Sequence, residues 1–144
     1  MRSRIDTLAM MNAQDQALML RHVTHPEDAN HQGTIFGGKI LSLIDEAAYL
    51  EARKHGLHRW VTILFDRVEF KAPVFIGDVL TVFTKTAATG RSSVTVSVDV
   101  EAERYRGGEK VMVTHATVKM VAVDKDGHSV DFRTKPEISD HLHP

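Results

Sequence analysis

The sequence predicts an α+β fold in which an antiparallel sheet of about five strands wraps around one long central helix. Three observations predict it: one strongly apolar helical stretch, four runs rich in Val and Thr after it, and one further apolar run before it. A helix that is apolar over most of its circumference needs cover on several sides, and a curled sheet provides that cover. The length of 144 residues suits a single domain, 1–144, with one hydrophobic core.

The stretch at residues 1–14 has no strong pattern and is expected to form a short peripheral arm. The first strand is expected at residues 16–23. A loop follows at residues 24–33, because residues typical of turns cluster there. These residues are Pro26, Asp28, Asn30 and Gly33.

The helix is expected at residues 38–55, where apolar residues recur with a helical period. Its last turn contains three basic residues, which suit the negative end of a helix, and Gly56 is placed to form the C-cap. The apolar face is unusually wide, so most of the helix must be covered. The residues of this face are Ile40, Leu41, Leu43, Ile44, Ala47, Ala48 and Leu50.

Four strands are expected after the helix, at residues 60–71, 79–88, 92–103 and 110–124. Glycine, proline and aspartate residues separate these runs and indicate short turns, as in an antiparallel sheet. In the third run, apolar residues from Val94 to Ala102 alternate with Ser, Thr, Asp and Glu, which is typical of a sheet with one buried face. The core is therefore expected at residues 16–126, with residues 127–144 as a peripheral tail.

Composition excludes several classes of function. The chain has 18 basic and 19 acidic residues, so no net field attracts it to nucleic acid or to an anionic membrane. The absence of cysteine excludes disulfides and a cysteine nucleophile, and polar residues interrupt any signal-peptide core, so a cytoplasmic location is expected. The nine histidines lack metal-ligand spacing, so we expect neither a metal nor a cofactor.

Asp45 is the candidate catalytic base. On the predicted helix it shares a row with Leu41, Ala48 and Ala52, so a carboxylate interrupts an apolar face. Glu46 lies on the most polar strip of the helix and is expected to be solvated. A partly desolvated carboxylate is a better proton acceptor for water. A solvated or salt-bridged aspartate at an interface between subunits is the alternative for Asp45.

Gly37 and Gly38 stand where the helix is expected to begin. The first amide groups of a helix have no partner within it, and glycine allows a ligand to approach the backbone closely. A thioester carbonyl bound there would have its developing negative charge stabilised by these donors and by the helix dipole. A plain tight turn is the alternative for this pair.

An ordered series of motifs resembles the hotdog-fold acyl-CoA thioesterases of the cytosolic acyl-CoA hydrolase and YciA type. The resemblance covers roughly residues 16–126. Its motifs are Pro26-x-x-Ala29-Asn30-x-x-Gly33-x-Ile35-Phe36-Gly37-Gly38 followed by Asp45, then Val68-x-Phe70-x-x-Pro73-Val74-x-x-Gly77-Asp78, Gly90-Arg91-Ser92-Ser93 and Val121-Ala122-Val123-Asp124.

The resemblance implies hydrolysis of acyl-CoA to a free acid and CoA at a site between two subunits. It implies that Asp45 acts as general base or nucleophile and that Asn30, from the opposite subunit, binds the water or the thioester. A homodimer is the implied minimal unit, and a hexamer built as a trimer of dimers is the expected assembly. The acyl chain length stays open, because loops and the partner subunit form the pocket wall.

The resemblance also implies contacts with CoA. Arg91 is the candidate ligand of a CoA phosphate, because a guanidinium binds phosphate oxygens in a forked geometry. The other residues of the implied substrate-binding set are Phe36, Gly90, Ser92 and Ser93. Two alternatives stay open: a hotdog protein that binds acyl-CoA without cleaving it, and a hotdog enoyl-CoA hydratase or dehydratase, which would require a histidine paired with a carboxylate.

Overall fold

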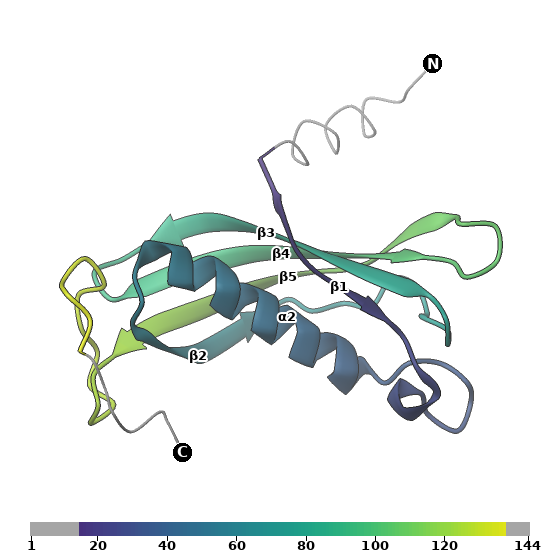
Figure 1. The fold of residues 1–144 in the computed structure, drawn as a ribbon, viewed down its shortest axis with the longest axis horizontal. Coiled ribbons are helices and arrows are strands. Elements are labelled where there is room, and N and C mark those ends of the chain that lie inside the picture. The colour runs from purple at the N-terminus through teal and green to yellow at the C-terminus, as the bar shows by residue number, and fades with distance from the viewer. Residues whose placement is uncertain (1–14, 138–144) are drawn as a thin grey trace.

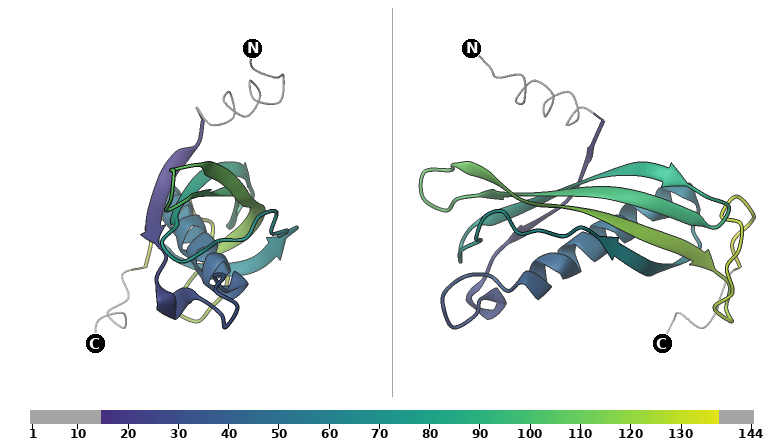
Figure 2. Two further views of the ribbon diagram at one scale, coloured as in Figure 1. Left: turned by 90° about the vertical axis from the view of Figure 1, so that its right-hand side faces the viewer. Right: turned by 180° about the vertical axis from the view of Figure 1, so that it is seen from behind.

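The computed structural model describes residues 15–137, so the predicted arm and residues 138–144 lie outside the described part. One long helix, α2 (Gly37–Ala52), lies along the concave side of a five-stranded sheet (Figure 1). Viewed along the helix, the strands curve around it (Figure 2). The predicted α+β fold, with one strand before the helix and four after it, is confirmed.

All strand pairs in the sheet are antiparallel, and the spatial order is β1-β3-β4-β5-β2. The first and the second strand in sequence therefore form the two edges. Short turns join β3 to β4 and β4 to β5, whereas α2 connects the two edges of the sheet. The strands are β1 (Ala17–Val23), β2 (Arg59–Asp66), β3 (Val79–Thr89), β4 (Ser93–Glu103) and β5 (Lys110–Val123).

The core fills the space between α2 and the concave face of the sheet. On β4, the predicted alternation holds, because every second residue from Val94 to Ala102 is fully buried. Ala47 and Ala48 of α2 are also fully buried, and their small side chains let the helix backbone lie close to the strands. Ile44 is the largest fully buried side chain of the helix.

Two helix boundaries follow from local sequence. A short 3-10 helix, η1 (Pro26–Asp28), forms in the loop before α2, with proline in its first turn, where its missing N–H costs nothing. At the other end, α2 tightens into a second 3-10 turn, η2 (Arg53–His55), before Gly56. The predicted helix at residues 38–55 is therefore correct in extent, with a change of helix type in its last turn.

The predicted strand at residues 60–71 is too long, because β2 ends at Asp66. Arg67 has a φ of 52°, in the left-handed region that side chains other than glycine rarely adopt, and this residue takes the chain out of the sheet. The chain then returns to contact β5, where Lys71 N–H donates to the Val113 carbonyl at 2.7 Å.

The prediction that residues from 127 onward form a peripheral tail is wrong for Phe132. This side chain is 5% exposed and belongs to the hydrophobic core. Its ring lies 5.9 Å from that of Trp60 and 5.6 Å from that of His55, so it closes the end of the core beside η2. An exposed tail was predicted because this segment is mostly polar. Its one aromatic residue nevertheless packs into the core and holds the segment there.

Among the residues described, no helix combines the length and the apolar character needed to cross a bilayer.

Candidate active site

The loop between β1 and α2 is fixed by one buried carboxylate. Asp28, 9% exposed, accepts hydrogen bonds from the His22 ring and from the His25 backbone N–H, each at 2.9 Å. The His22 hydrogen bond is the largest effect that lowers the pKa of Asp28; burial opposes it, and the charge of Lys39, 3.7 Å away, adds to the lowering. The Asp28 carbonyl in turn accepts from Phe36 N–H, which places the start of α2.

Two backbone donors stand free at the start of α2. The Phe36 carbonyl accepts hydrogen bonds from Lys39 N–H and Ile40 N–H. Within residues 15–137, no acceptor bonds to the N–H of Gly37 or Gly38, and no side chain caps the helix. A Cβ added to Gly38 would meet no atom within 4 Å, so its surroundings are open. These donors are available to a ligand, as the sequence predicts.

Aromatic side chains border these donors. A Cβ on Gly37 would lie 3.2 Å from the ring of Phe70, so this ring covers one side of the helix start. Phe36, 54% exposed, immediately precedes the two glycines, and Phe70 is 45% exposed. The donors therefore lie beside an apolar surface that favours an acyl or thioester group over bulk water.

Asp45 lies in the middle of α2, where its side chain is half-buried. The hydroxyl group of Thr62, on β2, donates a hydrogen bond to its carboxylate. This contact fixes the carboxylate from the sheet side. Glu46, the next residue, is exposed, as predicted.

The contact of Thr62 with Asp45 was not predicted from the sequence. Thr62 is the single polar residue between Trp60 and Phe65, in a run of otherwise apolar residues, and this interruption is the signal that could have identified it. Its side chain also lies 3.3 Å from the sulfur of Met120.

Asn30 closes a turn within its own loop. Its side-chain oxygen accepts from the backbone N–H of Gln32 at 2.9 Å and of Thr34 at 3.3 Å, and its amide nitrogen donates to the Thr34 hydroxyl at 2.9 Å. An asparagine amide carries two hydrogens, so one donor remains for another group. Within one chain, the turn role is thus the observed one.

The chain brings some predicted site residues together and keeps others apart. Asn30, Phe36 and the glycine pair belong to one loop and the helix start that follows it. Asp45 lies eight residues after Gly37, which corresponds to ~12 Å along the helix axis. One carbonyl group therefore cannot contact the Gly37 amide and the Asp45 carboxylate of the same chain closely.

The predicted CoA-binding turn lies at the opposite end of the molecule. Gly90, Arg91 and Ser92 form the turn between β3 and β4, beside the end of α2, whereas Asn30 lies near its start (Figure 1). Arg91 is exposed, with one weak contact of 3.5 Å to the Ser129 hydroxyl. A Cβ on Gly90 would lie 2.6 Å from the hydroxyl oxygen of Ser93, so a side chain there would require the Ser93 hydroxyl to rotate away.

Comparison with known proteins finds similar sequences and structures. Residues 32–109 match the family model of the thioesterase superfamily. The acyl-CoA thioester hydrolase YciA of Escherichia coli K12 is 32% identical over 113 residues, which cover 76% of this chain and 86% of that protein. A Haemophilus influenzae protein named as an uncharacterized acyl-CoA thioester hydrolase is 35% identical over 115 residues, which cover 78% and 75% of the two chains.

A hexameric hotdog-fold thioesterase of Campylobacter jejuni has a similar structure. The TM-score is 0.75 and the identity 40%, over 87% of this chain and 92% of that one. Its helix-in-sheet architecture is the one described above, so the fold of this chain is the hotdog fold. The match to the family model and the extent of both sequence similarities lead to one conclusion: the chain belongs to the thioesterase superfamily.

Proposed function

We propose that this chain hydrolyses acyl-CoA thioesters to a carboxylic acid and CoA. The observation that carries the proposal is that the chain supplies both kinds of group the reaction needs, unpartnered amides at Gly37 and Gly38 and a half-buried carboxylate at Asp45. The relatives in Escherichia coli and Haemophilus influenzae support the choice of substrate, because both are named as acyl-CoA thioester hydrolases.

In the proposed reaction, the Asp45 carboxylate takes a proton from water, and the water oxygen attacks the thioester carbonyl carbon. The carbonyl oxygen gains the negative charge, which the amides of Gly37 and Gly38 stabilise. The carbon–sulfur bond then breaks, and the proton held by Asp45 passes to the thiolate of CoA. The protons balance in this step, and we propose that neither a metal nor a cofactor takes part.

Two copies of the chain are needed for this reaction. The separation of ~12 Å between Gly37 and Asp45 along α2 exceeds the reach of one carboxylate. The amides of one protomer must therefore act with the aspartate of its partner. Asn30, which keeps one free amide hydrogen, is proposed to bind the water or the thioester in the same shared site.

The edge of the sheet supports a homodimer. β2 forms one edge, and three consecutive apolar residues on it are exposed: Ile63 by 59%, Leu64 by 53% and Phe65 by 36%. Such an edge invites pairing with another strand. A dimer is the proposed minimal unit, and a hexamer is proposed because the Campylobacter jejuni protein forms one. A monomeric mass in light scattering would contradict both.

The CoA end of the substrate is proposed to contact the turn formed by Gly90, Arg91, Ser92 and Ser93. Arg91 is exposed and has no carboxylate within 4 Å among residues 15–137, so its guanidinium is available to a phosphate. Phe36 is proposed to contact the acyl or pantetheine portion, because its ring is exposed next to the amide donors. The proposed location is the cytoplasm, because the absence of cysteine suits a reducing compartment.

A hydratase would need a histidine paired with a carboxylate. Residues 15–137 contain three such pairs: His115–Asp99 and His128–Asp124, whose histidine side chains are 49% and 81% exposed, and the more buried pair of His22 with Asp28. Asp28 also accepts from the His25 backbone and lies 3.7 Å from the Lys39 ammonium, so the pair holds the loop together. Hydrolysis therefore remains the proposed reaction. An enoyl-CoA incubated with the protein is expected to lose its thioester and to keep its double bond.

The catalytic role of Asp45 is tested by Asp45→Asn, with Glu46→Gln as the matched control. Removal of a general base typically costs 10²- to 10⁴-fold, so release of free CoA thiol should fall by at least about 10²-fold. The control removes a carboxylate from the next, exposed position and should keep full activity. Both variants should melt at the wild-type temperature. Near-full turnover by Asp45→Asn would exclude the assigned role.

A further inference from the structure

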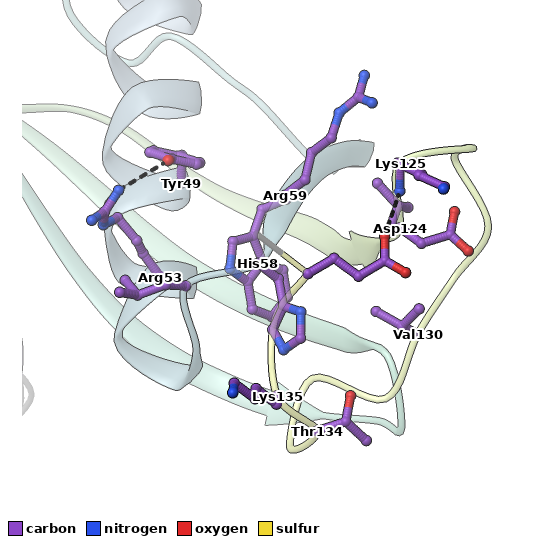
Figure 3. Close-up of a pocket in the computed structure, with 13 residues that line it drawn as sticks. Tyr49, Arg53, His58, Arg59, Asp124, Lys125, Val130, Thr134 and Lys135 are labelled. Carbon is purple, nitrogen blue, oxygen red and sulfur yellow. Dashed lines mark hydrogen bonds between the residues drawn. The ribbon is translucent and has the colours of Figure 1, made fainter. Parts of the chain in front are cut away.

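A cavity of about 670 Å³ lies at the end of α2, away from the glycine pair. Its walls come from the last turns of α2, from the first residues of β2, from the end of β5 and from the segment that follows (Figure 3). Ligand pockets in proteins span roughly 300–1,000 Å³, so this cavity has the size for a small organic molecule. None of the residues assigned above to the reaction or to CoA binding lines it.

Basic side chains surround this cavity. Arg53, Arg59, Lys125 and Lys135 lie on different sides of it in Figure 3, and they come from four separate segments of the chain. Among residues 15–137, none of the four has a carboxylate within 4 Å. Arg53 contacts only a neutral group there, the hydroxyl of Tyr49, at 3.2 Å. Mutually repelling cations around one concavity favour an anionic ligand.

The two acidic residues of the cavity, Asp124 and Glu137, offset the four cations only in part, and neither forms an ion pair with any of them. One carboxylate oxygen of Asp124 accepts from the backbone N–H of Asp126 and of His128, each at 2.9 Å. Glu137 accepts from the backbone N–H of Lys125 at 3.3 Å. The side-chain ammonium and guanidinium groups therefore keep their charge available to a ligand.

The cavity also has an apolar wall. Trp60 lines it with the small part of its ring that the core leaves exposed, 6%, and its indole N–H already donates to the Gly56 carbonyl at 2.9 Å, so that part is carbon. Leu57, 67% exposed, is a second apolar contributor. Apolar surface on one side and unpaired cations on the others match a molecule with a flat apolar body and several phosphate charges.

We propose that this cavity binds the phosphorylated nucleoside portion of a ligand. Two molecules offer this chemistry: a free nucleotide, and the 3′-phospho-ADP portion of CoA in a substrate held by this or another protomer. The second source rests on the proposed acyl-CoA hydrolysis, whereas the first does not. The experiments below separate them.

Binding is measured directly through Trp60, which is the only tryptophan of the chain. ADP and CoA are titrated separately into the full-length protein while its fluorescence is recorded. Either ligand should change the emission at a saturable concentration. The double variant Arg53→Gln/Arg59→Gln should weaken binding about ten-fold, which corresponds to the loss of one charge-assisted hydrogen bond. The control Arg106→Gln/Lys110→Gln removes two charges from the distant β4–β5 turn and should bind like wild type.

Whether the cavity binds a free nucleotide or the nucleotide portion of CoA is decided by comparing two substrates. These are acyl-CoA and the matching acyl-pantetheine, which lacks the nucleotide. If the cavity holds the CoA nucleotide, the double variant should raise KM for acyl-CoA about ten-fold, with kcat unchanged and acyl-pantetheine hydrolysis unaffected. If it holds a free nucleotide, ADP binding should weaken while KM for acyl-CoA stays constant. Both results support the site.

Wild-type fluorescence that responds to neither ADP nor CoA would overturn the proposal, as would equal binding by wild type and the double variant. A second protomer that fills the cavity in the native assembly would give the first of these results. Failure of the proposed hydrolysis looks different, because wild-type protein would then release no thiol from acyl-CoA or acyl-pantetheine whatever the fluorescence shows.

Discussion

The Gly37 amide hydrogen is the single atom whose removal tests the proposed oxyanion site at the scale of one residue. The substitution Gly37→Pro deletes that hydrogen and keeps the helix, because proline is favoured at the first helical position. Phe36 has φ −57° and ψ 134°, a conformation that suits a residue before proline. Loss of one oxyanion donor costs about 10²- to 10³-fold in kcat, so a drop of about that size is expected in thiol release.

Gly37→Ala is the matched control for this substitution. It adds the same Cβ contact with Phe70, at 3.2 Å, and it keeps the amide hydrogen. Its kcat should stay within about three-fold of wild type, since the donor is intact. Equal losses in both variants would mean that crowding by Phe70, and not the amide, limits the rate.

At this scale, the sequence identified the residues whose chemistry depends on backbone position. Two glycines before an apolar helix imply free amides, and an aspartate on an apolar helical row implies partial burial, as observed for Asp45. Thr62 escaped prediction because its contact with Asp45 joins residues 17 positions apart on different elements. Asn30 was also predicted among the turn residues of its loop, and the turn is what the chain shows.

At the scale of elements, a buried carboxylate ties α2 to β3. Glu51, 6% exposed, accepts from the hydroxyls of Thr84 and Thr86 at 2.9 Å and from the Lys54 ammonium at 3.0 Å. Burial alone would raise the pKa of Glu51, but these hydrogen bonds together outweigh it, so its pKa lies below that of an ordinary glutamate. The ionised form therefore stabilises the folded chain.

The pH dependence of this contribution has a definite sign. A carboxylate whose pKa is lower in the folded state stabilises it above the unfolded pKa, and this stabilisation is lost as the pH falls through the folded pKa. At neutral pH, Glu51→Gln should reduce the free energy of unfolding by about 1–3 kcal/mol, because the charge-assisted hydrogen bonds are lost. Denaturant melts from neutral to strongly acidic pH should show that the difference in free energy of unfolding between wild type and Glu51→Gln becomes smaller as the pH falls. A difference that grows on acidification would contradict the lowered pKa of Glu51.

Element types were predictable because the hydrophobic period differs so clearly between α2 and β4. The end of β2 was not predictable from the sequence. Residues 67–71 have the composition of a strand, but Arg67 turns the chain with a positive φ. The docking of the segment around Phe132 was missed for a related reason. Its partner, Trp60, is 72 positions away in sequence, and no local pattern reports such a contact.

At the scale of the whole molecule, the proposed reaction centre is shared by two protomers. Sharing is required because the amide donors and the proton acceptor are ~12 Å apart on one helix. The exposed apolar edge of β2 offers a surface on which a second copy can pair. The cavity lies at the opposite end of α2 from the glycine pair of the same chain.

The most direct test of the shared site is complementation between two inactive variants. Asp45→Asn and Gly37→Pro chains, each with a different affinity tag, are co-expressed, and assemblies that carry both tags are isolated by sequential purification. In a mixed dimer, one of the two sites receives both wild-type groups, so purified mixed dimers should recover about half of wild-type thiol release, and hexamers assembled at random from both chains about a quarter. Mixed assemblies that stay as inactive as either parent would contradict the shared site.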